Sequence, residues 1–280
     1  MKGQQELTQK AYLGIMVPFM LSTVTQPLLG AVDTAAIGMV GDAAAIAGVS
    51  LGANLFNTLY WLFGFLRVTT TGQSAQVQEK GPGEARTRSF FLPLIFSLII
   101  GSLFLVIRHP VLSGYLWLIK ADAEVLAYVR EYYRILIWGA PFVLSNYVML
   151  GWLMGQARVR ESLCMQVSGN LINMVLDYWF VIRLDFGMQG VAAATLAAQI
   201  YSCCLGGILI MKYGAFGRIR KKHLWSRAQI LSLIRQNRDL MLRTACLLVH
   251  NNVFAWKICF YWRGVIRYIV IVTLLLLLSV

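Results

Sequence analysis

The sequence predicts an all-α fold, a polytopic transmembrane helical bundle, and three observations indicate this class. Of the 280 residues, 58% are apolar and only 13% are charged, against about 25% charged in a soluble domain. The mean hydropathy is +0.65. Six charge-poor runs are each about long enough to cross a hydrocarbon core of roughly 30 Å as a helix. This composition argues against a disordered chain, a secreted disulfide scaffold and an ordinary soluble enzyme.

The six runs are expected to be helices, because strands or loops exposed to lipid would leave backbone polar groups unsatisfied. In order, they are residues 11–32, 43–66, 89–107, 135–157, 162–182 (interrupted by Asp177) and 186–211. We expect the first run to be retained, because its apolar length exceeds that of a cleaved signal peptide. Residues 120–134, before the fourth run, suit a helical extension lying at the membrane interface.

The charge distribution divides the chain into three parts. The six spans form one lobe, residues 1–213, and a basic inter-lobe loop follows at 214–243. Residues 212–243 hold nine basic residues and one acid, a large part of the net charge of +13. Basic loops beside membrane helices mark the cytoplasmic side and face anionic headgroups, so this charge indicates a lipid bilayer and not a nucleic acid. The tail, 244–280, is atypical and supplies at most one or two short membrane segments.

The loops also predict the orientation of the chain. Basic residues gather on the connections between spans two and three and between spans four and five, and on the segment after span six. By the positive-inside rule, these connections face the cytoplasm and the N-terminus lies inside.

Two carboxylates carry the strongest functional signal. Asp33 ends the first apolar run and Asp177 lies well inside the fifth, where an ionised carboxylate costs about 2.5–3.5 kcal/mol by insertion scales. Asn170, Asn173 and Asp177 are spaced i, i+3 and i+7 and so share one helical face. A proton or cation site facing a cavity is one interpretation, and a structurally paired or snorkelling carboxylate is the other.

Further polar residues occur on spans two and six. Asn54 and Asn57 lie near each other on span two, and Thr195 and Gln199 form a stripe on span six. These residues predict a shared substrate cavity, although hydrogen-bonded helix packing explains them equally well.

Helix one contains a candidate bending point. Pro27 removes one backbone hydrogen bond and frees the carbonyl four residues earlier, which kinks a helix. With Gly30 and Asp33 close behind, we expect proton binding at Asp33 to bias this helix between straight and bent forms.

The sequence offers little support for an enzyme. None of its three histidines stands in a recognisable nucleophile motif, and no Walker A sequence is present. The five cysteines form no CxxC pair. We therefore expect no catalytic residues, no metal site and no cofactor beyond H⁺ or Na⁺ as a coupling ion.

Three segments together resemble a known family. PLLGAVDTAAIG (27–38), LGANLFNTLYWLFGFLRVTTTGQSAQ (51–76) and GNLINMVLDYWFVIRLDFGMQGVAAATLAAQ (169–199) look like the multidrug and toxin extrusion (MATE) transporters. The likeness is strongest to the subfamily typified by the DNA-damage-inducible protein F. It implies a six-helix N-terminal lobe of a bacterial inner-membrane antiporter that exchanges H⁺ or Na⁺ for organic, often cationic or amphipathic, drugs and toxins. It also implies ion coupling by Asp33, Asn173 and Asp177.

The sequence departs from the family after about residue 243, where Lys, Arg and Trp replace an apolar seventh span. A truncation or frameshift would explain this, and the single chain would then be incomplete as a transporter. Alternatives are an inactive remnant or membrane subunit, and a lipid-linked oligosaccharide flippase of the same superfamily, for which Arg67 is a candidate basic residue. A half-length chain could also complete its cleft by forming a homodimer.

Overall fold

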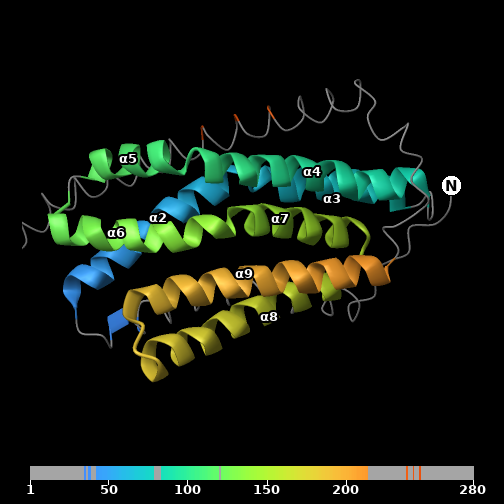
Figure 1. Ribbon diagram of the computed structural model, residues 1–280. Helices are drawn as coiled ribbons and strands as arrows, with labels where there is room; N and C mark the ends of the chain where they lie inside the picture. Colours follow the sequence, from blue (N-terminus) through green and yellow to red (C-terminus); the bar gives the residue numbers. More distant parts are fainter. Residues whose placement is uncertain are drawn as a thin grey trace, which may run out of the picture.

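The computed structural model describes residues 35, 37, 38, 42–78, 83–119, 121–213, 238, 242 and 246. The described part is a bundle of long helices running roughly parallel or antiparallel to one another (Figure 1). This confirms the predicted all-α class. The helices are α2 Ala43–Leu62, α3 Phe65–Gln78, α4 Glu84–Val106, α5 Arg108–Ile119, α6 Ala123–Leu136, α7 Ala140–Gly155, α8 Val159–Asp177 and α9 Gly187–Lys212.

Four helical stretches of the described chain are long and apolar enough to cross a membrane. They are Ala43–Gln78, Glu84–Val106, Ala123–Gly155 and Gly187–Lys212. Each contains one of the predicted spans in whole or nearly so, namely the second, third, fourth and sixth. The first predicted span lies outside the described residues. The fifth corresponds to α8, which is 19 residues long but is less apolar than the other four, because it carries charged residues and the polar residues singled out above.

Three of the helical stretches, Ala43–Gln78, Glu84–Val106 and Ala123–Gly155, are longer than the uncharged runs that predicted them. The second span does not end before Arg67 but continues as α3 to Gln78, after a break at Phe63 and Gly64. The described part of residues 120–134 forms a helical extension before the fourth span, as predicted, and its position at the membrane interface stays a prediction. Most of them belong to α6, which joins α7 through a single 3₁₀ turn, Ile137–Gly139. A charged residue therefore marks where apolar sequence stops, but it does not mark where the helix stops.

Helix α7 lies at the centre of the bundle and packs against α3, α4, α8 and α9. Its close contacts depend on glycine. A Cβ at Gly151 would meet the backbone of Arg67, and one at Gly155 would meet the backbone of Thr71. Small residues four apart let two helix backbones approach closely. The Gly151–Gly155 spacing therefore fixes α7 directly against α3.

The same device holds α2 against α6. A Cβ at Gly48 would collide with Tyr128, and one at Gly52 would lie 2.6 Å from the ring of Tyr132. Phe56 continues this contact one turn later by stacking on Tyr133, with ring centroids 5.3 Å apart. One face of α2 is thus buried against α6, and the opposite face is left outside this contact.

Candidate functional site

Asn173 and Asp177 form the most deeply buried polar pair in the described part of the chain. They lie one turn apart on α8, where Asn173 is 3% exposed and Asp177 is fully buried. The side-chain amide Nδ2 of Asn173 donates a hydrogen bond of 2.5 Å to Oδ2 of Asp177. Hydrogen bonds to charged groups are about twice as strong as neutral ones, so the amide holds the carboxylate in one orientation. Asn170 lies one turn earlier on the same helix and is half-buried.

The helix changes character immediately after Asp177. Residues Tyr178–Arg183 form a π-helical segment, which closes with a hydrogen bond from the Leu184 N–H to the Trp179 carbonyl, five residues earlier, at 3.1 Å. Single π-helical turns inside α-helices are frequent at functional sites. Here the wider turn lies directly beside the buried carboxylate. The segment is held in place by α9, because Gly190 packs against the backbone of Phe180.

The residues predicted on α9 make contacts within the bundle. The Thr195 hydroxyl donates to the Val191 carbonyl of its own helix at 2.9 Å. The Gln199 side chain lies against Gly139, and its backbone carbonyl accepts a hydrogen bond of 3.1 Å from Asn146 on α7. These contacts are those of helix packing. A role for Thr195 and Gln199 in a substrate cavity stays a prediction.

Asn54 and Asn57 differ from the α8 pair because both side chains are exposed. They lie on the face of α2 that points away from α6, together with Ser50 and with Trp61, which is 50% exposed. The structure therefore does not bring these asparagines together with Asp177. Asp33, Pro27 and Gly30 lie outside the described residues.

Two features of the bundle were not predicted from the sequence. The glycine pairs of α2 and α7 could have been found, because each is a G-x-x-x-G spacing in an apolar run. Tyr147 on α7, which lies close to Arg67 on α3, could not, because a single tyrosine in an apolar helix carries no signal until its neighbours are known. In the described residues, no group of three or more His, Cys, Asp or Glu side chains is arranged to hold a metal ion.

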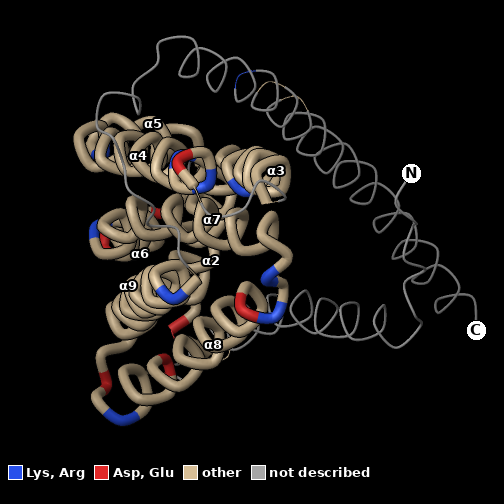
Figure 2. The backbone as a smooth tube through the Cα atoms, turned by 90° about the vertical axis from the view of Figure 1, so that its right-hand side faces the viewer, with Lys and Arg blue, Asp and Glu red and all other residues tan. Residues whose placement is uncertain are grey.

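The two ends of the bundle differ in charge. We call the end where α3, α7 and α9 finish the basic end, and Figure 2 views the molecule from this side, with Lys and Arg segments on α3, α4, α8 and α9. The helix turns at this end, together with the α7–α8 turn, carry two acidic residues, Glu84 and Glu161. They carry five basic residues, Arg86, Arg88, Arg158, Arg160 and Lys212. The opposite end and α6 carry four arginines, Arg108, Arg130, Arg134 and Arg183, and five acids, Asp42, Asp122, Glu124, Glu131 and Asp185.

The basic end is tied together by contacts to Tyr213. The Arg86 guanidinium donates to the Tyr213 carbonyl at 3.0 Å, and the Arg158 guanidinium lies 4.4 Å from the centre of the Tyr213 ring. A hydrogen bond with Glu161 raises the pKa of the Tyr213 phenol. These contacts join the first turn of α4, the start of α8 and the end of α9.

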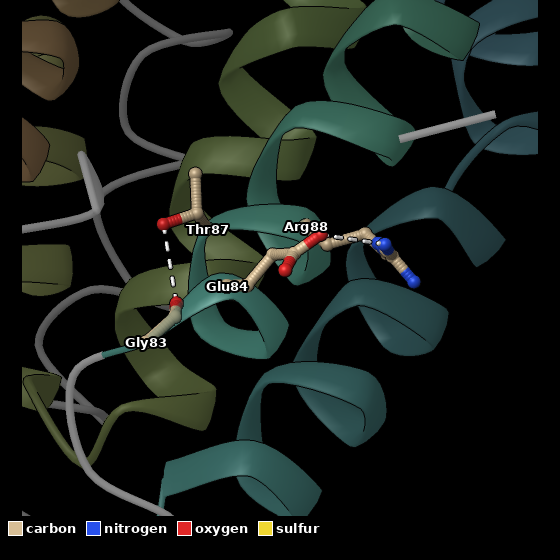
Figure 3. A network of polar contacts seen from close by, with 4 residues as sticks. All are labelled: Gly83, Glu84, Thr87 and Arg88. Carbon is tan, nitrogen blue, oxygen red and sulfur yellow. Dashed lines mark hydrogen bonds and ion pairs between the residues drawn. The ribbon is translucent and has the colours of Figure 1, made fainter. Parts of the chain in front are cut away.

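The start of α4 has its own polar network (Figure 3). Arg88 pairs with Glu84 at 3.1 Å, and the Thr87 hydroxyl donates to the Gly83 carbonyl at 3.3 Å. Glu84 lies in the first helical turn, where a negative charge is favoured by the helix dipole.

At the opposite end, Asp42 caps α2 and joins it to α6. Its carboxylate accepts hydrogen bonds from the Ala44 backbone N–H at 2.8 Å and from the Tyr128 hydroxyl at 2.5 Å. The Tyr128 hydrogen bond is the largest of the three hydrogen-bonding effects, with those of the Ala44 and Ala45 backbone, that lower the pKa of Asp42.

The architecture and the buried carboxylate define a class, a polytopic α-helical membrane lobe with an ionisable group inside it. Comparison with known proteins identifies the family. The sequence matches the MatE family over residues 18–179, and the chain belongs to this family of membrane transporters, which are not enzymes.

Two relatives and one solved structure illustrate the likeness. The chain is 35% identical over 244 residues to DNA damage-inducible protein F of Escherichia coli strain K12, covering 86% of this chain and 53% of that protein. It is 25% identical over 231 residues to multidrug resistance protein MdtK of Klebsiella pneumoniae strain 342, covering 80% and 50%. The outward-facing structure of a multidrug resistance MATE transporter matches with a TM-score of 0.74 at 24% identity, over 83% of this chain and 52% of that one. This chain thus spans about half the length of these relatives.

Proposed function

We propose that the chain is the N-terminal lobe of a secondary transporter that exports amphipathic organic compounds in exchange for H⁺ or Na⁺. The observation that carries the proposal is the fully buried carboxylate of Asp177, held by Asn173 inside a bundle of the MatE family. A carboxylate at this depth is costly unless it binds a cation or proton. The name of the relative MdtK, a multidrug resistance protein, and the membership of this chain in a transporter family support the transport class.

In this proposal, Asp177 and Asn173 act together with Asp33 as the coupling site. Binding a proton or Na⁺ at the carboxylate neutralises its charge, and the adjacent π-helical segment transmits the change to α9. Bending of helix one at Pro27 and Gly30 is the conformational step that this coupling drives. Asn54, Asn57, Asn170, Thr195 and Gln199 are the proposed cavity residues.

We further propose that the chain lies in a bacterial inner membrane with its N-terminus in the cytoplasm. The excess of basic over acidic residues at the basic end supports this orientation. In that arrangement residues 1–213 form the lobe, 214–243 a cytoplasmic loop and 244–280 an atypical tail. Reporter fusions after residue 82 and residue 213 should be active on the cytoplasmic side, and a fusion after residue 120 on the other side.

Cation binding by the purified full chain tests the coupling site. We expect Na⁺ or proton uptake by the wild type, its loss in Asp177→Asn, and no change in Asp122→Asn. Asp122 is a matched control because it is exposed at the end of the bundle and its side chain does not cap α6. Equal uptake by wild type and Asp177→Asn would overturn the assignment.

Dye efflux from cells that lack their own exporters tests transport separately. Efflux that disappears in Asp177→Asn supports the antiporter. If the inserted chain binds the ion but exports no dye, single-chain export is refuted and the non-transporting subunit remains. Crosslinking in mild detergent then tests whether two copies pair into a cleft.

A further inference from the structure

A second polar centre lies on the other side of α7, around Arg67. This residue is on α3, within the span Ala43–Gln78, and its side chain is partly buried. Its Nη2 donates to the Met154 sulfur at 3.2 Å. A thioether is a weak acceptor. The two ion pairs of the described residues join Arg88 to Glu84 and Arg158 to Glu161, so no described carboxylate pairs with Arg67.

Two phenols accompany this guanidinium. Tyr147 on α7 interacts electrostatically with both Arg67 and Tyr60. Tyr60 is only 8% exposed, and its hydroxyl is buried without a hydrogen-bond partner in the described part of the chain. A buried hydroxyl left without a partner costs about 1–3 kcal/mol. The cluster thus combines a cation with two hydroxyl donors, and the Met154 sulfur is the acceptor that the structure gives Arg67.

The cluster is held in a fixed position. Tyr147, Gly151 and Met154 recur at i, i+4 and i+7 on the face of α7 that meets α3, and Gly151 packs directly on the Arg67 backbone. Between Tyr60 and Arg67 the helix tightens into i→i+3 hydrogen bonds, including Gly64 N–H to the Trp61 carbonyl and Arg67 N–H to the Gly64 carbonyl at 3.1 Å. A short 3₁₀ stretch inside a helix often marks a functional hinge or a strained sequence.

We propose that Arg67, Tyr147 and Tyr60 form a binding site for an oxyanion carried on an apolar body. A planar guanidinium matches a carboxylate or phosphate with two parallel hydrogen bonds, and the phenols supply further donors. The preceding residues Phe65 and Leu66 are buried in the apolar core of the bundle, so the surroundings of this segment are apolar. The site has the opposite sign to the Asp177 pair, which lies on α8 against α9. It therefore selects an acidic group, whereas Asp177 selects a cation or proton.

Two kinds of ligand have an oxyanion on an apolar body. One is an amphipathic organic acid, and the other is an anionic phospholipid of the inner leaflet. Met154, the contact of Arg67, lies one residue before the end of α7 at the basic end. A lipid phosphate at the membrane surface could therefore reach the guanidinium, as could the acid group of a solute within the bundle.

Binding of a fluorescent fatty acid, dansyl-undecanoic acid, tests the site directly in the full chain reconstituted into phosphatidylcholine nanodiscs. We expect Arg67→Gln to weaken binding about tenfold or more, which is the range of a charge-assisted hydrogen bond. Arg67→Lys should weaken binding less, because it keeps the charge and loses only the planar fork. Tyr147→Phe should weaken it by a few-fold, and it also serves as a second variant if Arg67→Gln fails to fold.

The controls separate this site from general surface charge. Arg158→Gln removes a basic residue outside the cluster and should leave the affinity unchanged. The methyl ester of the probe should bind weakly and equally to the wild type and to Arg67→Gln. Unchanged affinity in Arg67→Gln, or an equal loss in Arg158→Gln, would overturn the proposal.

Competition identifies the source. If phosphatidylglycerol displaces the probe from the wild type, and does not change the remaining probe binding of Arg67→Gln, the site binds a lipid. If the fatty acid binds through Arg67 and phosphatidylglycerol does not compete, the site serves an organic acid. Both outcomes support the oxyanion site, and neither depends on whether the single chain transports.

Discussion

Two pairs of polar residues with similar spacing have opposite environments in this bundle. Asn173 and Asp177 on α8 are almost completely buried and bonded to each other, whereas Asn54 and Asn57 on α2 are exposed. Spacing on a helix determines which residues share a face, but the neighbouring helices determine whether that face is buried. Burial therefore imposes a desolvation free energy on Asn173 and Asp177, whereas Asn54 and Asn57 stay exposed and have no such cost.

The largest expected difference comes from removing one amide in each pair. Asn173→Ala leaves the buried Asp177 carboxylate without its amide donor, which should destabilise the lobe by about 3 kcal/mol. Asn54→Ala should change stability by less than about 0.5 kcal/mol, as is usual at exposed positions. Unfolding of both variants in the same detergent measures this difference. Equal destabilisation by the two changes would show that the burial of the α8 pair has no energetic consequence.

A second, smaller effect compares two faces of the long helix formed by α2 and α3. Gly48→Ala introduces a Cβ that would meet Tyr128 on α6, and such overpacking costs about 1–3 kcal/mol. Gly72 is exposed on α3 with no atom near its missing Cβ. Gly72→Ala should therefore stabilise the helix by about 0.5–1 kcal/mol. Thermal unfolding of the two variants should shift in opposite directions, and a shift in the same direction would contradict this packing.

The smallest effect concerns pH at the end of α2. Hydrogen bonds from Tyr128 and Ala44 lower the pKa of Asp42 from its ordinary value of 3.8. Because the folded-state pKa is the lower one, the stabilisation is present above the ordinary value and is lost as the pH falls from there through the lowered pKa. Tyr128→Phe should weaken this acid dependence of unfolding, and Asp42→Asn should remove it. If Asp42→Asn unfolds with the same acid dependence as the wild type, that dependence comes from another carboxylate.

Part of the candidate site could be predicted from spacing alone. Asn173 and Asp177 are four residues apart in a helix, so their side chains meet whatever surrounds them. The apolar runs likewise indicated the approximate place of the membrane helices, and the sequence motifs indicated the family. The helix ends were predicted less well, because an arginine such as Arg67 near the end of a span does not stop an α-helix.

The sequence by itself determined the fold class, the approximate positions of the helices and the local pairing on α8, because all three follow from hydropathy and helical periodicity within short segments. Only the tertiary structure decided that Asn54 and Asn57 are exposed and that Arg67 lies beside Tyr147, 80 residues further along the chain. Contacts between helices depend on how their backbones cross and how closely they approach. Gly48 and Gly151 set that approach through contacts with Tyr128 and Arg67 on other helices.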